Sequence, residues 1–213
     1  MTERVFLTNG PADAPDRFVL AHGAGSPMDS TTMEAIATGV SAAGVRVVRF
    51  EFPYMRQRRD GGSRRPPDRQ AVLLETWREV IDALGGAESL VIGGRSMGGR
   101  MASLIADAVG ARGLVCLGYP FHPPGKPERL RTEHLADLRT PTLIVQGERD
   151  AFGSSAEVGG YDLSDAIRIH WLADGDHSFV PRKRSGHTTA GHLATTVAET
   201  AGFIQSLDRA TPD

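Results

Sequence analysis

Short apolar runs separated by glycine-rich or polar segments recur along the chain. Most of these runs are continuously apolar, which is typical of strands buried on both faces of a sheet. Glycine, proline or polar turn residues bound them, so their lengths suit strands better than helices. The runs that predict strands cover residues 5–7, 17–21, 45–50, 90–92, 114–118, 142–146 and 167–171.

Between these runs, apolar residues recur at the spacing of one helix face. Asp29 or Ser30 can cap the first expected helix, and Asp68 can cap the second. Another helix follows residue 96, a short one lies near 130–138, and a closing helix spans roughly 187–207. The polar residues 53–67 predict a loop. The expected inward faces are Met33, Ile36, Ala37 and Val40; Val72, Leu73, Trp77, Val80, Ile81 and Leu84; Met101, Leu104, Ile105 and Ala108; and Leu193, Val197, Ala201 and Ile204.

Strands that alternate with helices are typical of βαβ units. The sequence therefore predicts an α/β fold, with a mostly parallel sheet of about seven strands and helices on both faces. The chain shows neither an internal repeat nor an interdomain linker, so residues 1–213 are expected to form one domain. In such sheets the functional side chains lie at the C-terminal ends of the strands.

Composition narrows the classes of function. A formal net charge of -2 gives no overall attraction to nucleic acid or anionic membranes. Cys116 is the only cysteine, so neither a disulfide framework nor a thiolate metal site is expected. The chain begins without the apolar core of a signal peptide, and no apolar run approaches the length of a membrane span. We therefore expect a cytoplasmic protein with no metal and no cofactor.

One stretch, residues 90–102, carries the strongest chemical signal. An apolar run ends in glycines, Ser96 stands between Gly94 and Gly98, and a helical pattern follows at once. This is the G-x-S-x-G pattern of a nucleophile elbow, in which a strand turns sharply into a helix. Side chains two positions either side of the apex would collide, which is why glycine is needed there. Ser96 is the candidate nucleophile.

A serine hydroxyl needs a base within hydrogen-bond reach, and the base needs an orienting group. Asp150 follows the strand at 142–146, and His177 lies in the loop after the last strand, so both are expected at the same sheet edge. Asp150 could instead be an ordinary turn residue, with Glu148 as the substitute acid. The predicted roles are Ser96 as nucleophile, His177 as base and then acid, and Asp150 as orienter of the imidazole.

The negative charge that develops on the substrate needs two N–H donors. The amide of Met97, directly after the elbow, is one candidate. The second is expected from the loop 22–25, His-Gly-Ala-Gly, with Ala24 as the donor and Gly23 as the alternative. His22 is a candidate pocket residue that would brace this loop; alternatively, it is an ordinary hydrogen-bonded histidine.

The connection 119–140 is too short for a lid domain, so a shallow, open pocket is expected. Tyr119 and Phe121 are predicted to wall it, with Tyr54 and Met97 as further candidates. Arg95 could point into the site or pack away from it. The arginines of residues 56–69 could hold a carboxylate or phosphate of the substrate, or could form a solvated loop.

Five segments together resemble a family of small α/β-hydrolases that includes bacterial predicted hydrolases, the animal testis-expressed protein 30 and subunit 3 of the animal NSL histone-acetyltransferase complex. A more distant similarity is to the dienelactone hydrolases, whose usual nucleophile is cysteine, whereas residue 96 is serine. The resemblance implies the α/β-hydrolase fold and supports the same three catalytic residues, but it implies no substrate. The segments are residues 21–25, 52–55, 93–100, 146–153 and 174–179.

Two functions of different classes follow from the sequence. The first is a serine hydrolase of small carboxylic esters or thioesters that acts through an acyl-enzyme on a small-molecule substrate, with no nucleic-acid or membrane partner. Peptidase and C–C bond hydrolase activity are alternatives within this class, which the spacing of the motifs does not separate. The second is a non-catalytic interaction module or scaffold that keeps the fold, as the resemblance to the NSL subunit allows. The presence of all three triad residue types favours the enzyme. The sequence does not indicate an oligomeric state.

Overall fold

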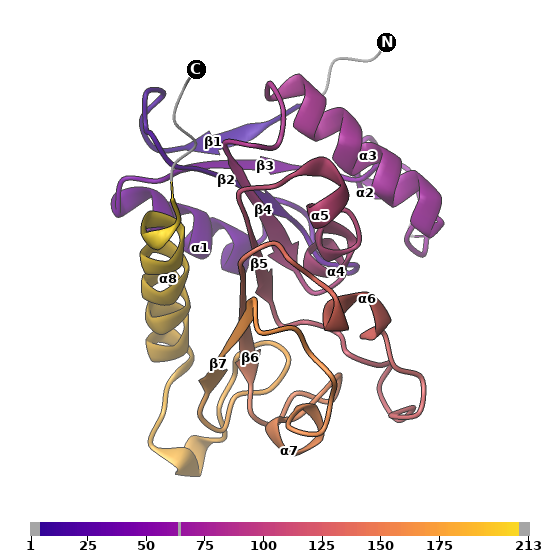
Figure 1. Ribbon diagram of the computed structural model, residues 1–213, viewed down its shortest axis with the longest axis vertical. Helices are drawn as coiled ribbons and strands as arrows, with labels where there is room; N and C mark the ends of the chain where they lie inside the picture. Colours follow the sequence, from indigo (N-terminus) through magenta and orange to yellow (C-terminus); the bar gives the residue numbers. More distant parts are fainter. Residues whose placement is uncertain (1–4, 64, 209–213) are drawn as a thin grey trace.

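The protein is described by a computed structural model that covers residues 5–63 and 65–208 and contains one seven-stranded sheet (Figure 1). The strand order is β1-β3-β2-β4-β5-β6-β7. β1 pairs with β3 in antiparallel orientation, and the other neighbours are parallel. The strands are β1 (Leu7–Asn9), β2 (Arg17–Ala21), β3 (Arg46–Phe50), β4 (Leu90–Arg95), β5 (Gly113–Leu117), β6 (Thr142–Gly147) and β7 (Ile167–Leu172).

Helices cover both faces of this sheet. Figure 1 shows α1 and α8 on one side and α3, α4, α5 and α6 on the other. The helices are α1 (Thr31–Ala42), α2 (Pro53–Arg59), α3 (Gln70–Ala83), α4 (Met97–Ser103), α5 (Ala106–Val109), α6 (Glu133–Ala136), α7 (Ser155–Val158) and α8 (Thr189–Ser206), with a 3₁₀ turn η1 (Lys183–Ser185). None of the described helices is long and apolar enough to cross a membrane.

The central strands are buried on both faces, as their continuous apolar character predicts. In β2, Phe18 and Leu20 pack into the core beneath α1 and α8, while Val19 and Ala21 pack into the core on the opposite face. Alternate residues of a strand point to opposite faces, so a two-sided core needs an unbroken apolar run. The predicted α/β fold, with a mostly parallel sheet and helices on both faces, is confirmed.

The polar composition of residues 53–67 predicted a loop throughout, but the first part of this segment is helical. Pro53 begins helix α2, where its fixed φ suits the first helical turn and its missing N–H costs nothing. Tyr54 and Met55 are buried, while Arg58 and Arg59 lie in the exposed last turn. Because most residues of this segment are charged or polar, the sequence pattern did not indicate this short amphipathic helix.

The helix after the elbow is interrupted, contrary to the prediction of one continuous helix. α4 ends at Ser103, and the separate turn α5 buries Ala106 and leaves Ala108 exposed. The break changes the rotational register, so Ala108 does not share a face with Met101 and Ile105. The first strand is also displaced by two residues from its predicted position, because Leu7 pairs with Arg49 while Val5 is largely exposed.

The connection between β5 and β6 contains only the four-residue helix α6, so no lid domain is inserted there. Parallel pairing aligns the C-terminal ends of the central strands, with Ala21 opposite Gly94, Arg95 opposite Leu117, and Gly147 opposite Leu172. Loops that follow these strands therefore emerge along one sheet edge.

Candidate active site

Ser96 lies at the sharp turn between β4 and α4. Its backbone has φ 50° and ψ -114°, in the left-handed half of conformational space that a residue with a side chain seldom adopts. A Cβ at Gly94 would lie 2.5 Å from the Ala21 carbonyl oxygen, and a Cβ at Gly98 would lie 2.6 Å from the His22 carbonyl oxygen. Only glycine fits at these two positions, so the G-x-S-x-G pattern has a steric basis here.

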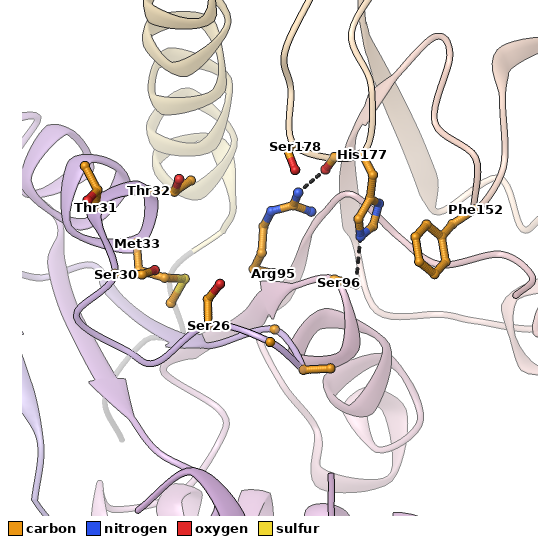
Figure 2. A pocket seen from close by; sticks show the side chains of 13 residues that line it. Ser26, Ser30, Thr31, Thr32, Met33, Arg95, Ser96, Phe152, His177 and Ser178 are labelled. Carbon is orange, nitrogen blue, oxygen red and sulfur yellow. Dashed lines mark hydrogen bonds between the residues drawn. The ribbon is translucent and has the colours of Figure 1, made fainter. Parts of the chain in front are cut away.

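Three side chains from different loops meet at this turn. His177 Nε2 lies 3.0 Å from Ser96 Oγ, and His177 Nδ1 lies 2.7 Å from Asp150 Oδ2. Figure 2 shows the His177 ring between Ser96 and Phe152, and the rings of His177 and Phe152 have centroids 4.2 Å apart. A base in contact with the hydroxyl and a carboxylate behind the base is an arrangement that can activate a serine.

Asp150 is buried and accepts three hydrogen bonds. Its Oδ2 accepts from Gln146 Nε2 at 2.9 Å as well as from His177, and its Oδ1 accepts the Phe152 N–H at 2.8 Å. Glu148, the alternative acid, instead accepts the Asp174 N–H at 2.8 Å. The geometry therefore brings Asp150, and not Glu148, to the imidazole.

Gln146 has a structural role that the sequence analysis did not assign. It is fully buried, and its amide also bridges the backbone N–H and carbonyl of Tyr119 at 2.6 and 3.1 Å. The available signal was a single amide at the end of an otherwise apolar strand, since a buried polar group must find partners.

Arg95, which the sequence left either in the site or packed away from it, lies beneath the histidine loop and also lines the pocket beside Ser96. Its guanidinium donates to the carbonyl oxygen of His177 (Figure 2). It also donates to the carbonyl oxygen of Leu117 and lies 4.7 Å from the centroid of the Phe179 ring. Burial lowers the pKa of Arg95 to about 10, against the opposing influence of the Asp150 and Asp176 carboxylates. The group stays charged at neutral pH and holds the backbone of the loop that carries His177.

His22 braces the loop 22–25. Phe52 N–H donates to His22 Nε2 at 3.2 Å, which leaves Nδ1 as the protonated nitrogen that donates to the Gly23 carbonyl at 2.7 Å. Burial lowers the pKa of His22, which favours this neutral form. The Tyr54 hydroxyl donates to the Ala24 carbonyl at 3.0 Å, and burial raises the pKa of Tyr54.

A pocket of about 510 Å³ opens beside Ser96 and His177. Figure 2 shows serine and threonine side chains of the first turn of α1 and the loop before it on one side, with His177 and Phe152 on the other. The pocket is lined by Gly23, Ala24, Gly25, Ser26, Ser30, Thr31, Thr32, Met33, Arg95, Ser96, Phe152, His177 and Ser178.

Two of the predicted pocket walls are wrong. Tyr119 and Phe121 are fully buried in the core, where their rings contact each other and the Gln146 amide holds the Tyr119 backbone. Met97 packs against the same core, and His22 is fully buried, so neither lines this pocket. Tyr54 lies below the loop 22–25 and lines a second pocket on the other side of it.

The arginines of residues 56–69 do not act as one group. Arg59 donates two hydrogen bonds to Asp29, each 2.8 Å long, and also bonds Glu51 at 2.7 and 3.0 Å. Arg58 and Arg65 instead line the second pocket. Arg64, another member of this predicted group, lies outside the described residues.

A parallel sheet covered on both faces, with a strained serine between the central strand and its helix, defines the α/β-hydrolase class. The model of the alpha/beta hydrolase domain family matches residues 14–205, so the chain belongs to this family. The narrower resemblance to testis-expressed protein 30 and the NSL subunit stays a prediction.

Solved structures share this fold at low sequence identity. Dienelactone hydrolase from Anabaena variabilis is similar with a TM-score of 0.70 and 19% identity, covering 96% of this chain and 92% of that one. Est1E from Butyrivibrio proteoclasticus, solved with ferulic acid, is similar with a TM-score of 0.67 and 14% identity, covering 95% of this chain and 96% of that one. XC6422 from Xanthomonas campestris, described as a serine hydrolase without a lid, is similar with a TM-score of 0.62 and 19% identity, covering 100% of this chain and 98% of that one.

Proposed function

We propose that this protein is a serine hydrolase of small carboxylic esters or thioesters, with Ser96, His177 and Asp150 as its catalytic triad. The observation that carries the proposal is the continuous contact from Asp150 Oδ2 through both nitrogens of His177 to Ser96 Oγ. The esterases and hydrolases among the structures of similar fold support hydrolytic chemistry of this kind.

In the first half of the reaction, His177 Nε2 takes the proton of Ser96 as Oγ attacks the substrate carbonyl. Asp150 stabilises the imidazolium and keeps Nδ1 protonated. Collapse of the tetrahedral intermediate breaks the bond to the leaving group, which receives the proton from His177. Water, activated by the same imidazole, then hydrolyses the acyl-enzyme and regenerates the free serine.

The backbone N–H groups of Met97 and Ala24 would hold the oxyanion. Met97 is the first residue of α4, where the helix itself offers no acceptor for the N–H. The Gly23 carbonyl is bound by His22, and no cis peptide bond occurs among the described residues, so the Ala24 N–H of that peptide points away from His22. Each such donor contributes roughly 3 kcal/mol to transition-state stabilisation.

The lining of the pocket favours short acyl groups. Ser26, Ser30 and Thr32 offer hydroxyls there, and Met33 and Phe152 are its large apolar side chains. A long alkyl chain would leave these hydroxyls without hydrogen-bond partners, at a cost in binding free energy. We therefore expect acetyl and propionyl esters to be better substrates than octanoyl esters.

A fluorophosphonate probe tests this function directly, because it phosphonylates only an activated serine. We expect the wild type to be labelled and the Ser96→Ala variant to remain unlabelled, with 4-nitrophenyl acetate hydrolysis lost in parallel. Equal labelling and equal ester turnover in the two proteins, under conditions that label a control esterase, would contradict the proposal and favour a non-catalytic module.

A further inference from the structure

A second pocket lies directly behind the loop that would bind the oxyanion. It has a volume of about 410 Å³ and is lined by Ala24, Gly25, Tyr54, Arg58, Arg65, Pro66 and Pro67. Ala24 and Gly25 also line the pocket beside Ser96. The two pockets thus share Ala24 and Gly25 as lining residues, which places the two arginines next to the pocket that contains Ser96.

The ion pairs of this region separate its arginines into two kinds. Arg59 is held by Asp29 and Glu51, so its charge is neutralised within the protein. Arg58 is exposed and has no ion-pair partner among residues 5–63 and 65–208. Arg65 lies 3.4 Å from Asp68 Oδ1, while Oδ2 of the same carboxylate accepts the Tyr54 N–H. Two guanidinium groups therefore line this pocket and one neighbouring carboxylate contacts Arg65, which leaves a net positive charge.

We propose that Arg58 and Arg65 form an anion subsite of the active site, which binds a carboxylate or phosphate carried by the substrate. This inference rests on the proposed ester or thioester hydrolysis, because it names the substrate class of the same site. Guanidinium groups bind both anions with paired hydrogen bonds. Pro66 and Pro67 restrict the backbone directly after Arg65, which reduces the conformational entropy lost when that side chain binds.

A simpler role for these charges makes a different prediction. Arg58 lies in the last turn of α2, where a cation stabilises the helix dipole, and exposed arginines also serve as solvated surface. A solvated positive surface can raise the encounter rate of an anionic substrate whichever arginine carries the charge. A preference that depends on Arg58 and Arg65 in particular is therefore the property that separates a subsite from a surface.

Two pairs of substrates measure that preference and identify the source of the anion. Mono-4-nitrophenyl adipate against 4-nitrophenyl hexanoate places a carboxylate on the acyl side. Acetyl-CoA against S-acetyl-N-acetylcysteamine places phosphates on the leaving group of an otherwise equivalent thioester. We expect kcat/KM to be at least tenfold higher for the anionic member of one pair, mainly through KM, and the advantage to shrink as ionic strength rises.

The double variant Arg58→Gln/Arg65→Gln should reduce the ratio of kcat/KM for the anionic substrate over the neutral one to within about twofold of unity. The matched control is Arg69→Gln/Arg78→Gln, which removes the same charge from exposed positions outside both pockets and should keep the preference. If turnover is present and neither anionic substrate is preferred, or if the control loses the preference equally, the subsite is wrong.

Binding to an inactive protein keeps the inference independent of catalysis. Calorimetric titration of the Ser96→Ala variant with pyrophosphate and with adipate should show saturable binding of at least one. Adding Arg58→Gln and Arg65→Gln to that variant should raise the Kd of the bound anion tenfold or more. Saturable binding in a protein that hydrolyses no ester would reject the hydrolase and keep the anion site. Binding of neither probe, or equal binding after the arginines are removed, would reject the anion site alone.

Discussion

Asp150 presents one oxygen to the imidazole, and the direction of its hydrogen bonds fixes the tautomer of His177. Gln146 Nε2 and the Phe152 N–H both donate to this carboxylate, so the third contact must also be donated, by His177 Nδ1. Nε2 is then left free of hydrogen and able to accept the proton of Ser96. The orientation of a carboxylate thus determines which nitrogen can act as the base.

This arrangement makes Asp150→Asn a sharp test. An asparagine amide that keeps its oxygen toward the Phe152 N–H directs its NH₂ at His177, which favours the tautomer that cannot accept from Ser96. We expect kcat for 4-nitrophenyl acetate to fall by roughly a thousandfold or more with little change in KM. Glu148→Gln is the control and should stay within about twofold of wild type. An equal loss in both variants would contradict the assignment of the acid.

The sequence could predict the three candidate catalytic residues, but it could not predict the contacts of the residues that hold them in place. Ser96, Asp150 and His177 each follow a recognisable strand, and a parallel sheet brings such positions to one edge. The contacts of Arg95 and Gln146 depend on where the loops of other strands lie, which no local pattern encodes. Tyr119 was misassigned for the same reason, because an aromatic residue in a loop after a strand can face the pocket or the core.

The close contact between α1 and α8 depends on one small residue. A Cβ at Gly39 would lie 2.7 Å from the Val197 Cγ2 atom, so the two helices approach where α1 has no side chain. Gly202, near the end of α8, is exposed, and a Cβ built there meets no atom within 4 Å. Both glycines lie within helices, so only their surroundings differ.

Alanine substitutions at these two glycines should therefore change stability in opposite directions. Gly202→Ala should raise the free energy of unfolding by up to about 1 kcal/mol, because alanine loses less backbone entropy in a helix. Gly39→Ala should lower it by about 1–3 kcal/mol, because the added methyl overpacks the contact with Val197. Urea unfolding monitored by circular dichroism measures both. Similar stabilisation by both alanines would mean that α1 and α8 do not pack this closely.

At this scale the periodic helices were predictable, while the irregular ones were not. α1, α3 and α8 each contain several apolar residues at the spacing of one helix face, and these helices were predicted within a few residues. Helix α7 has only four residues; the capping box of Ser154 and Glu157 closes its first turn, and Val158 is the buried residue that apolar spacing alone cannot reveal in so short a segment. Segments this short give no periodicity, so sequence pattern could not distinguish them from turns.

Across the whole molecule, two partly or fully buried histidines couple folding to pH. Burial is the largest influence on both. It lowers the pKa of His134 to about 4, helped by the positive charge of Arg100, and it lowers the pKa of His22. The Ser103 hydroxyl lies 2.9 Å from His134 Nε2, and Glu51 and Arg59 exert opposing influences on His22. In the unfolded chain both imidazoles regain an ordinary pKa near 6.5.

Between about pH 6.5 and pH 4 the unfolded chain therefore binds more protons than the native protein, and acidification favours unfolding. We expect the free energy of unfolding, measured by urea titration, to decrease steadily from pH 7 to pH 5. His134→Gln removes one of the two titrating groups but can still hydrogen-bond Ser103, so its pH dependence should be shallower than that of the wild type. A wild-type stability that is flat over this range, or a variant whose curve runs parallel to it, would mean that these imidazoles are hydrated and titrate normally in the folded protein.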